Sequence, residues 1–74
     1  MLERRFYRDR YNAAKVWEVV KLSHGYYLRQ YINGVQFGRG SRRRKADIED
    51  IGIFDFEEVK GFQPRKPGSQ PLIG

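Results

Sequence analysis

The chain contains no cysteine, and its 74 residues include only one histidine, one tryptophan and three prolines. Without cysteine there is no disulfide framework and no thiolate metal site. The single His24 excludes a zinc site of clustered histidines and removes the usual group from most acid–base mechanisms. Long apolar runs are also missing, which argues against a membrane-spanning segment or a secretory signal. We therefore expect an intracellular, cytoplasmic protein.

The arrangements that mark common catalytic and cofactor sites are missing too. Neither G-x-x-x-x-G-K nor G-x-G-x-x-G occurs, and the serines form no recognisable set with His24. The six carboxylates between residues 46 and 59 do not follow the spacing of a calcium-binding EF-hand loop. We expect a binding module that has no enzymatic activity and holds no metal or other cofactor.

Positive charge is abundant and unevenly distributed. The chain has 15 Lys and Arg against nine Asp and Glu, a net charge of +6, with a pI near 10.0. Residues 1–45 carry a net charge of +9, residues 46–59 carry −6 and residues 60–74 carry +3. A basic region of this strength is typical of proteins that bind nucleic acid.

The first fourteen residues favour a helix. Leu2, Phe6 and Ala13 fall on one side of a helical projection, and Tyr7 and Tyr11 fall on a neighbouring stripe. Arginines fill the rest, and no proline or glycine interrupts the run. The alternative is a flexible basic arm. We expect an amino-terminal helix over residues 2–14.

The middle of the chain predicts an antiparallel meander. Residues 16–22 and 26–32 are rich in β-branched and aromatic side chains, and residues 35–39 form a third, shorter run. Asn33-Gly34 is a strong hairpin signal, because both positions of the turn need positive φ.

The register of the first hairpin decides which side chains form the core. A three-residue loop at residues 23–25 puts the following set on the buried face: Val16, Val20, Leu22, Tyr26, Leu28, Ile32, Val35 and Phe37. The opposite face then carries Trp17, Val19, Lys21, Tyr27, Arg29, Tyr31 and Gln36. A two-residue loop exchanges the faces of the first strand and buries Trp17. The better separation of apolar residues favours the three-residue loop.

The rest of the chain predicts a short helix, a short strand and a tail. Residues 45–51 suit a helix that ends at Gly52, and residues 53–56 suit a short fourth strand. The expected fold is an α+β domain over residues 1–60. It contains a small three-stranded meander with this fourth strand, the amino-terminal helix and the short helix after the third strand. Residues 61–74 hold all three prolines and read as a flexible tail.

The strongest candidate for a site is the basic run that follows Gly38. Guanidinium groups match phosphate oxygens in a bidentate fork, and neighbouring glycines let backbone N–H groups approach a phosphate. The alternative without a binding role is a solvated loop that aids solubility. The expected phosphate contacts are Arg39, Arg42, Arg43, Arg44 and Lys45, with Arg4, Arg5, Arg8 and Arg10 from the amino end.

The second candidate is the sheet face with interleaved aromatic and basic residues. Rings stack on unpaired bases while cations hold the backbone beside them. This face would place Lys21, Tyr27, Arg29 and Tyr31 against the nucleic acid, with Trp17 beside them. The alternative is that the amino-terminal helix covers this face and the rings belong to the core.

The leading hypothesis is therefore a non-catalytic module that binds DNA or RNA. A meander followed by a short helix is similar in arrangement to integrase-arm and AP2-like DNA-binding domains. No sequence motif supports this resemblance, so it assigns no functional residues here. The second hypothesis is a small protein–protein adaptor or inhibitor, of a kind that phages and mobile elements encode. Exposed aromatic residues and the split charge suit such an interface. An unpaired sheet edge also allows a homodimer.

Overall fold

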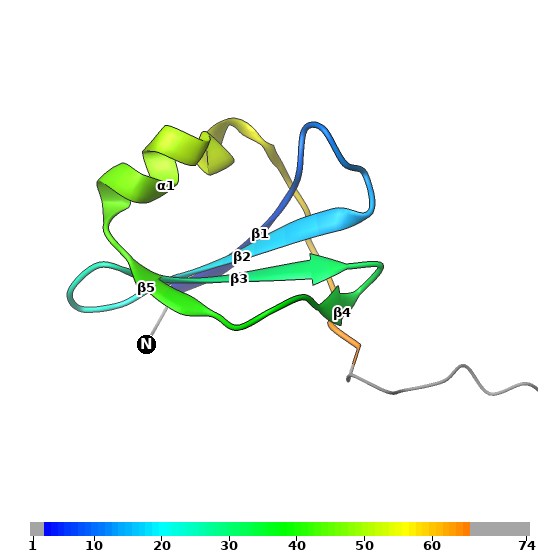
Figure 1. The fold of residues 1–74 in the computed structure, drawn as a ribbon, viewed down its shortest axis with the longest axis horizontal. Helices are drawn as coiled ribbons and strands as arrows, with labels where there is room; N and C mark the ends of the chain where they lie inside the picture. Colours follow the sequence, from blue (N-terminus) through cyan, green and yellow to red (C-terminus); the bar gives the residue numbers. More distant parts are fainter. Residues whose placement is uncertain (1–2, 66–74) are drawn as a thin grey trace, which may run out of the picture.

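The computed structural model describes residues 3–65, which fold as one twisted antiparallel sheet with a single α-helix above it (Figure 1). Along the sheet the strands lie in the order β4-β3-β2-β1-β6, and β5 pairs with the other half of β3. The elements in chain order are β1 (Glu3–Arg8), β2 (Lys15–Lys21), β3 (Tyr26–Ile32), β4 (Val35–Gln36), β5 (Ser41–Arg43), α1 (Lys45–Ile51), the 3₁₀-helix η1 (Ile53–Asp55) and β6 (Glu57–Glu58).

The expected fold, a three-stranded meander with an amino-terminal helix, is wrong. Residues 3–8 form β1, which pairs with β2 along its whole length, from Glu3 opposite Lys21 to Arg8 opposite Val16. Phe6 and Tyr7 point to opposite faces of the sheet, because successive side chains alternate in a strand. The helical spacing of the apolar residues there was coincidental, and pairing with β2, the next strand along the chain, overrode it.

The turn after β1 is held by two side chains. The Asp9 carboxylate accepts the Tyr11 N–H at 2.9 Å, and the Asn12 side-chain oxygen accepts the Ala14 N–H at 3.0 Å. Each carboxylate or amide reaches a backbone N–H two residues on, which is the Asx-turn pattern. These two bonds reverse the chain where a helix was expected to continue.

The two hairpins around β3 had different outcomes. The Asn33-Gly34 turn is confirmed, with φ of 51° and 84° and Ile32 opposite Val35. The β2–β3 connection is a four-residue loop, because Lys21 lies opposite Tyr26. The expected three-residue loop, and with it the expected core face, is therefore wrong. An even loop length puts Trp17 and Val19 on the buried face with Leu28.

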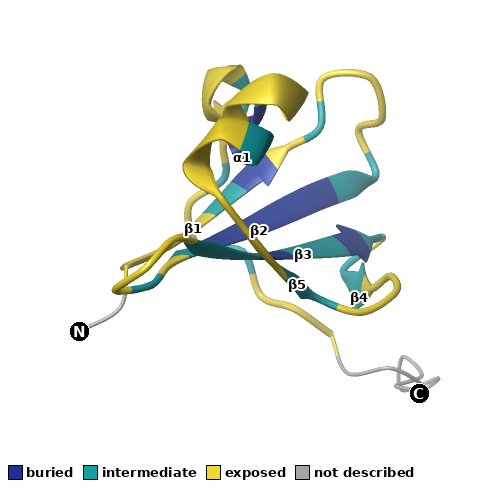
Figure 2. Ribbon diagram, turned by 60° about the vertical axis from the view of Figure 1, so that its left-hand side comes forward, coloured by how far each residue is buried: buried dark blue, intermediate teal, exposed yellow. Residues whose placement is uncertain are grey.

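The main core lies between this face of the sheet and the helical segment (Figure 2). It consists of Tyr7, Trp17, Val19, Leu28, Ile48 and Ile53, with Tyr26 and Phe56 packed against them. The predicted helix over residues 45–51 is confirmed, and Gly52 ends it at φ 84°. The predicted strand over residues 53–56 is wrong, since Ile53–Asp55 form η1 and the strand follows at Glu57–Glu58.

The opposite face of the sheet carries a smaller cluster. Phe62 lies 4.9 Å from Phe6 and 5.4 Å from Tyr31, measured between ring centroids. Further on, the Arg65 N–H donates to the Gly34 carbonyl, and Arg65 forms a bridge with Val35. Residues 61–65 of the expected tail thus contact the sheet, and its remainder, 66–74, lies outside the described residues. Within residues 3–65 no helix is long and apolar enough to cross a membrane.

Candidate nucleic-acid interface

The basic run begins in β5, which pairs with β3, and continues into α1. Arg42 and Arg43 belong to β5, Arg44 precedes α1 and Lys45 is its first residue, and all four are exposed. Together with the β2–β3 loop they form an open groove of about 710 Å³, which we call the basic groove. Its lining residues are His24, Gly25, Tyr26, Arg42, Arg43, Arg44, Lys45 and Asp47.

Most of the basic groove is free of internal ion pairs. Within residues 3–65, Arg42, Arg43 and Lys45 have no carboxylate within 4.0 Å, whereas Arg44 lies 3.7 Å from Asp47. Arg39 is exposed on the β4–β5 loop and does not line the groove. Three cations therefore remain available to an anionic ligand.

The arginines of the amino end are placed differently. Arg5 pairs with Glu3 at 2.5 Å and reaches Glu58 at 4.0 Å, and Arg8 reaches Glu57 at 3.9 Å. The Tyr7 hydroxyl and then Glu3 raise the pKa of Arg5. Glu57 and Glu58, from the acidic segment 46–59, thus lie beside β1, because β6 pairs with β1. These two carboxylates do not line the basic groove.

The expected aromatic and basic face does not assemble as one surface. Lys21 lies on the helix side of the sheet with Tyr26, while Tyr27 and Arg29 lie on the other side. Tyr31 is only 4% exposed, and Trp17 is buried in the main core. Neither of those two rings can stack on a base from the sheet surface.

The face of the sheet opposite α1, which we call the far face, holds a buried carboxylate that the sequence analysis did not identify. Glu18 is fully buried and accepts hydrogen bonds from the Arg4 Nε, from Arg29 at 3.1 Å and from the Tyr31 hydroxyl at 3.0 Å. Burial disfavours the charged form of Arg29, but the bond and charge of Glu18 outweigh it, so the pKa of Arg29 is raised. Burial, followed by Glu18, raises the pKa of Tyr31. Arg4 and Arg29 therefore form ion pairs with Glu18, and their charge is less available to an external ligand.

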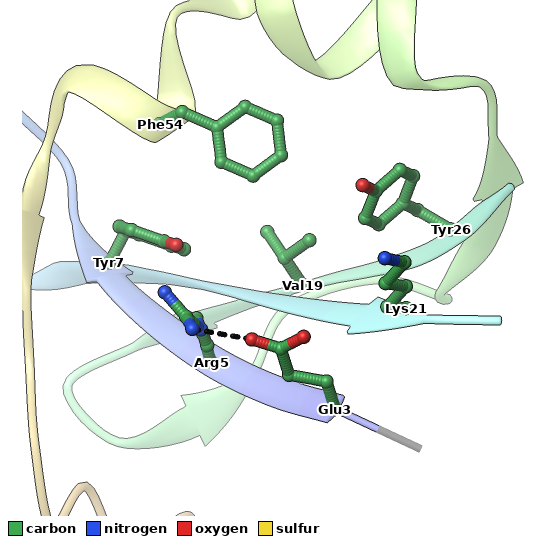
Figure 3. A pocket seen from close by; sticks show the side chains of 7 residues that line it. All are labelled: Glu3, Arg5, Tyr7, Val19, Lys21, Tyr26 and Phe54. Carbon is green, nitrogen blue, oxygen red and sulfur yellow. Dashed lines mark ion pairs between the residues drawn. The ribbon is translucent and has the colours of Figure 1, made fainter. Parts of the chain in front are cut away.

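A second cavity opens beside the basic groove, between the sheet and η1 (Figure 3). We call it the aromatic pocket; its volume is about 200 Å³, and it is lined by Glu3, Arg5, Tyr7, Val19, Lys21, Tyr26 and Phe54. The rings of Tyr7, Tyr26 and Phe54 surround the space above Val19. Since the rings come from β1, β3 and η1, no local sequence pattern could have indicated the pocket.

No group of three or more His, Asp or Glu side chains in residues 3–65 is arranged to hold a metal ion. Comparisons of the chain with known protein families, with curated proteins and with solved structures found no match. The site must therefore be interpreted from its own geometry and charge.

Proposed function

We propose that the protein is a non-catalytic nucleic-acid-binding module that grips the phosphate backbone in the basic groove. One observation carries the proposal: Arg42, Arg43 and Lys45 are exposed, line the same groove and have no carboxylate of residues 3–65 within 4.0 Å. Guanidinium groups bind phosphate oxygens through two parallel hydrogen bonds, and lysine adds a point charge. The paired arginines of β1 contribute less, because their charge is already offset.

The salt dependence of binding tests this mechanism. Three neutralised phosphates predict a loss of affinity of about 20- to 40-fold between 50 and 200 mM salt, the smaller value applying to a single strand. Anisotropy titrations of labelled duplex DNA, single-stranded DNA and RNA at both salt concentrations measure it. An affinity that does not change with salt, or the absence of binding at 50 mM salt, would refute the proposal.

A matched pair of charge reversals locates the contact. Arg42→Glu/Arg43→Glu and Arg10→Glu/Lys60→Glu both lower the net charge by four, but only the first pair lines the basic groove. We expect the first variant to lose most of the affinity and most of the salt dependence. We expect the second to lose only the long-range attraction, which salt screens. Equal losses in the two variants would mean that net charge alone drives association.

The alternative function, a protein–protein adaptor, is supported by two exposed rings. Tyr11 is 86% exposed on the β1–β2 loop and Phe37 is 62% exposed on the β4–β5 loop. Rings of this kind often anchor interfaces. Capture of a protein partner by the native chain, with loss of capture in Tyr11→Ala or Phe37→Ala, would favour this function over the first.

A further inference from the structure

We infer that the ligand is single-stranded and that the aromatic pocket takes one of its unpaired bases while the basic groove holds the adjoining phosphates. The inference rests on the proposed function, because it adds a base site to the phosphate site. It excludes an intact duplex as the preferred ligand, since paired and stacked bases cannot enter a pocket without being extruded at a cost in free energy.

The size and lining of the aromatic pocket fit one planar ring. An apolar cavity of about 150 Å³ is known to accept benzene, and this pocket offers about 200 Å³. The ring centroid of Phe54 lies 6.1 Å from that of Tyr7 and 6.0 Å from that of Tyr26, and both pairs are edge-to-face. Phe54 is itself 38% exposed to solvent. A base can therefore contact Phe54 without separating the three rings.

The charges at the rim of the pocket select the kind of ring. Three aromatic residues around a cavity also suit a cationic ligand, but here Lys21 stands at the rim beside Tyr26 (Figure 3). Arg5 is neutralised by Glu3, whereas Lys21 has no carboxylate within 4.0 Å among residues 3–65. The rim therefore repels a cation and favours a neutral ring attached to an anion.

The two cavities share a wall, which links the base site to the phosphate site. Tyr26 lines both the aromatic pocket and the basic groove. On the helix side of the sheet Tyr26 lies opposite Lys21 on β2 and opposite Arg43 on β5. Lys21 and Arg43 are thus two strand spacings apart, about 10 Å, with the Tyr26 ring between them. One continuous strand can place a base beside Tyr26 and its phosphates on the cations to either side.

Two oligomers with equal charge separate the base contact from the phosphate contact. The probes are a labelled single strand of eight thymidines and the same backbone with every base removed. We expect the thymidine strand to bind about 5- to 150-fold more tightly, which is the contribution of stacking one base. A mixed-sequence duplex of the same length should bind less tightly than the thymidine strand, because its bases are paired and stacked and cannot enter the pocket. An RNA strand of eight uridines shows whether the sugar matters.

The matched variants are Phe54→Leu, which removes the ring but keeps apolar bulk, and Phe37→Leu, which alters an exposed ring outside the pocket. Phe54→Leu should abolish the preference for bases, and Phe37→Leu should preserve it. Trp17 emission and circular dichroism verify that both variants fold. If Phe54→Leu does not fold, the comparison of the two strands on the native protein still tests the base site, and Lys21→Gln should weaken binding of both strands because it removes a phosphate contact.

Failures of the two proposals look different. If the native protein binds thymidine and abasic strands equally and with the same salt dependence, the base site is refuted while the phosphate site stands. A higher affinity for the duplex than for the thymidine strand would also refute the base site and leave the phosphate site intact. If neither oligomer binds at 50 mM salt, the proposed function is refuted, and the base site with it.

Discussion

The Tyr31 hydroxyl donates a hydrogen bond of 3.0 Å to the carboxylate of Glu18, one of the three largest fully buried side chains among residues 3–65. Arg4 and Arg29 supply the compensating charge from neighbouring strands. A buried carboxylate is tolerated only with such partners. The far face of the sheet is therefore organised around an acid, whereas the helix side is organised around apolar groups.

Replacing Glu18 by Gln should destabilise the fold strongly. The amide keeps the shape but leaves two guanidinium groups and a hydroxyl without their anion. The loss of charged hydrogen bonds to Glu18 should cost about 1.5–3 kcal/mol, because Arg4 and Arg29 are partly exposed and water can solvate them. Urea unfolding followed by Trp17 emission measures the change. Glu49→Gln, on the exposed side of α1, should shift the free energy of unfolding by less than about 0.5 kcal/mol. Similar shifts in both variants would contradict the assignment.

Acid should weaken the turn that follows β1. The Asp9 carboxylate accepts the Trp17 Nε1–H at 2.9 Å. Burial alone would raise the pKa of Asp9, but the bonds from Trp17 and from the Tyr11 N–H prevail and hold it below the ordinary 3.8. A lowered pKa means that the folded state gains stability above pH 3.8 and loses it as the pH falls through the folded value.

Asp9→Asn tests this pH dependence. At neutral pH the variant should be less stable by about 1 kcal/mol, a value reduced for partial hydration of the carboxylate. The difference should narrow as the pH falls from 3.8 through the lower pKa of the folded state, because the wild-type carboxyl then becomes neutral in both the unfolded and the folded protein. Asp50→Asn on α1 serves as the control, because the Asp50 side chain forms no hydrogen bond or ion pair within residues 3–65. A difference for Asp9→Asn that is constant from pH 7 to pH 2.5 would disprove the charge effect.

The docking of α1 on the sheet depends on one fully buried side chain. Ile48 is 0% exposed in the main core, while Ile51 on the same helix is 43% exposed. Ile48→Ala should cost about 2–5 kcal/mol, and Ile51→Ala much less. A core of this size supplies only about 3–5 kcal/mol in total. Thermal unfolding should therefore show Ile48→Ala largely unfolded at 37 °C, and a melting temperature equal to that of Ile51→Ala would refute this docking.

Gly40 should resist substitution because the β4–β5 loop crosses close over β3. A Cβ atom at this position would lie 2.3 Å from the Tyr27 Cε2 and 2.8 Å from the Arg29 Cγ. Gly40→Ala should destabilise the fold by about 1–3 kcal/mol through overpacking. In a double-mutant cycle with Tyr27→Ser, the cost should shrink, since the ring is the main obstacle. Additive effects would mean that the Tyr27 ring moves aside freely.

Local signals predicted the parts of this fold that depend on neighbouring residues. Asn33-Gly34 defined its hairpin, and Gly52 defined the end of α1, because each turn requires φ values that few residues adopt. The identity of residues 1–14 could not be settled locally. Their apolar spacing fits a helix, and only pairing with β2, the next strand along the chain, makes residues 3–8 a strand.

The errors at the candidate site have a similar origin. One additional loop residue between β2 and β3 exchanged the two faces of β2, which moved Trp17 into the core and separated Lys21 from Tyr27. The sequence did locate the basic run beside glycines. It could not show which arginines face carboxylates, because β1 meets β6 only in three dimensions.

The contact between Phe6 and Phe62 ties the start of the sheet to a segment made 56 residues later. A growing chain on the ribosome therefore leaves the rings of Phe6 and Tyr31 without this partner until Phe62 has emerged. Pairing of β1 with β6 imposes the same wait. Such long-range closure slows the search for the native state. Truncation before Phe62 should consequently leave an open sheet that aggregates, and its yield in the soluble fraction should be lower than that of the full chain.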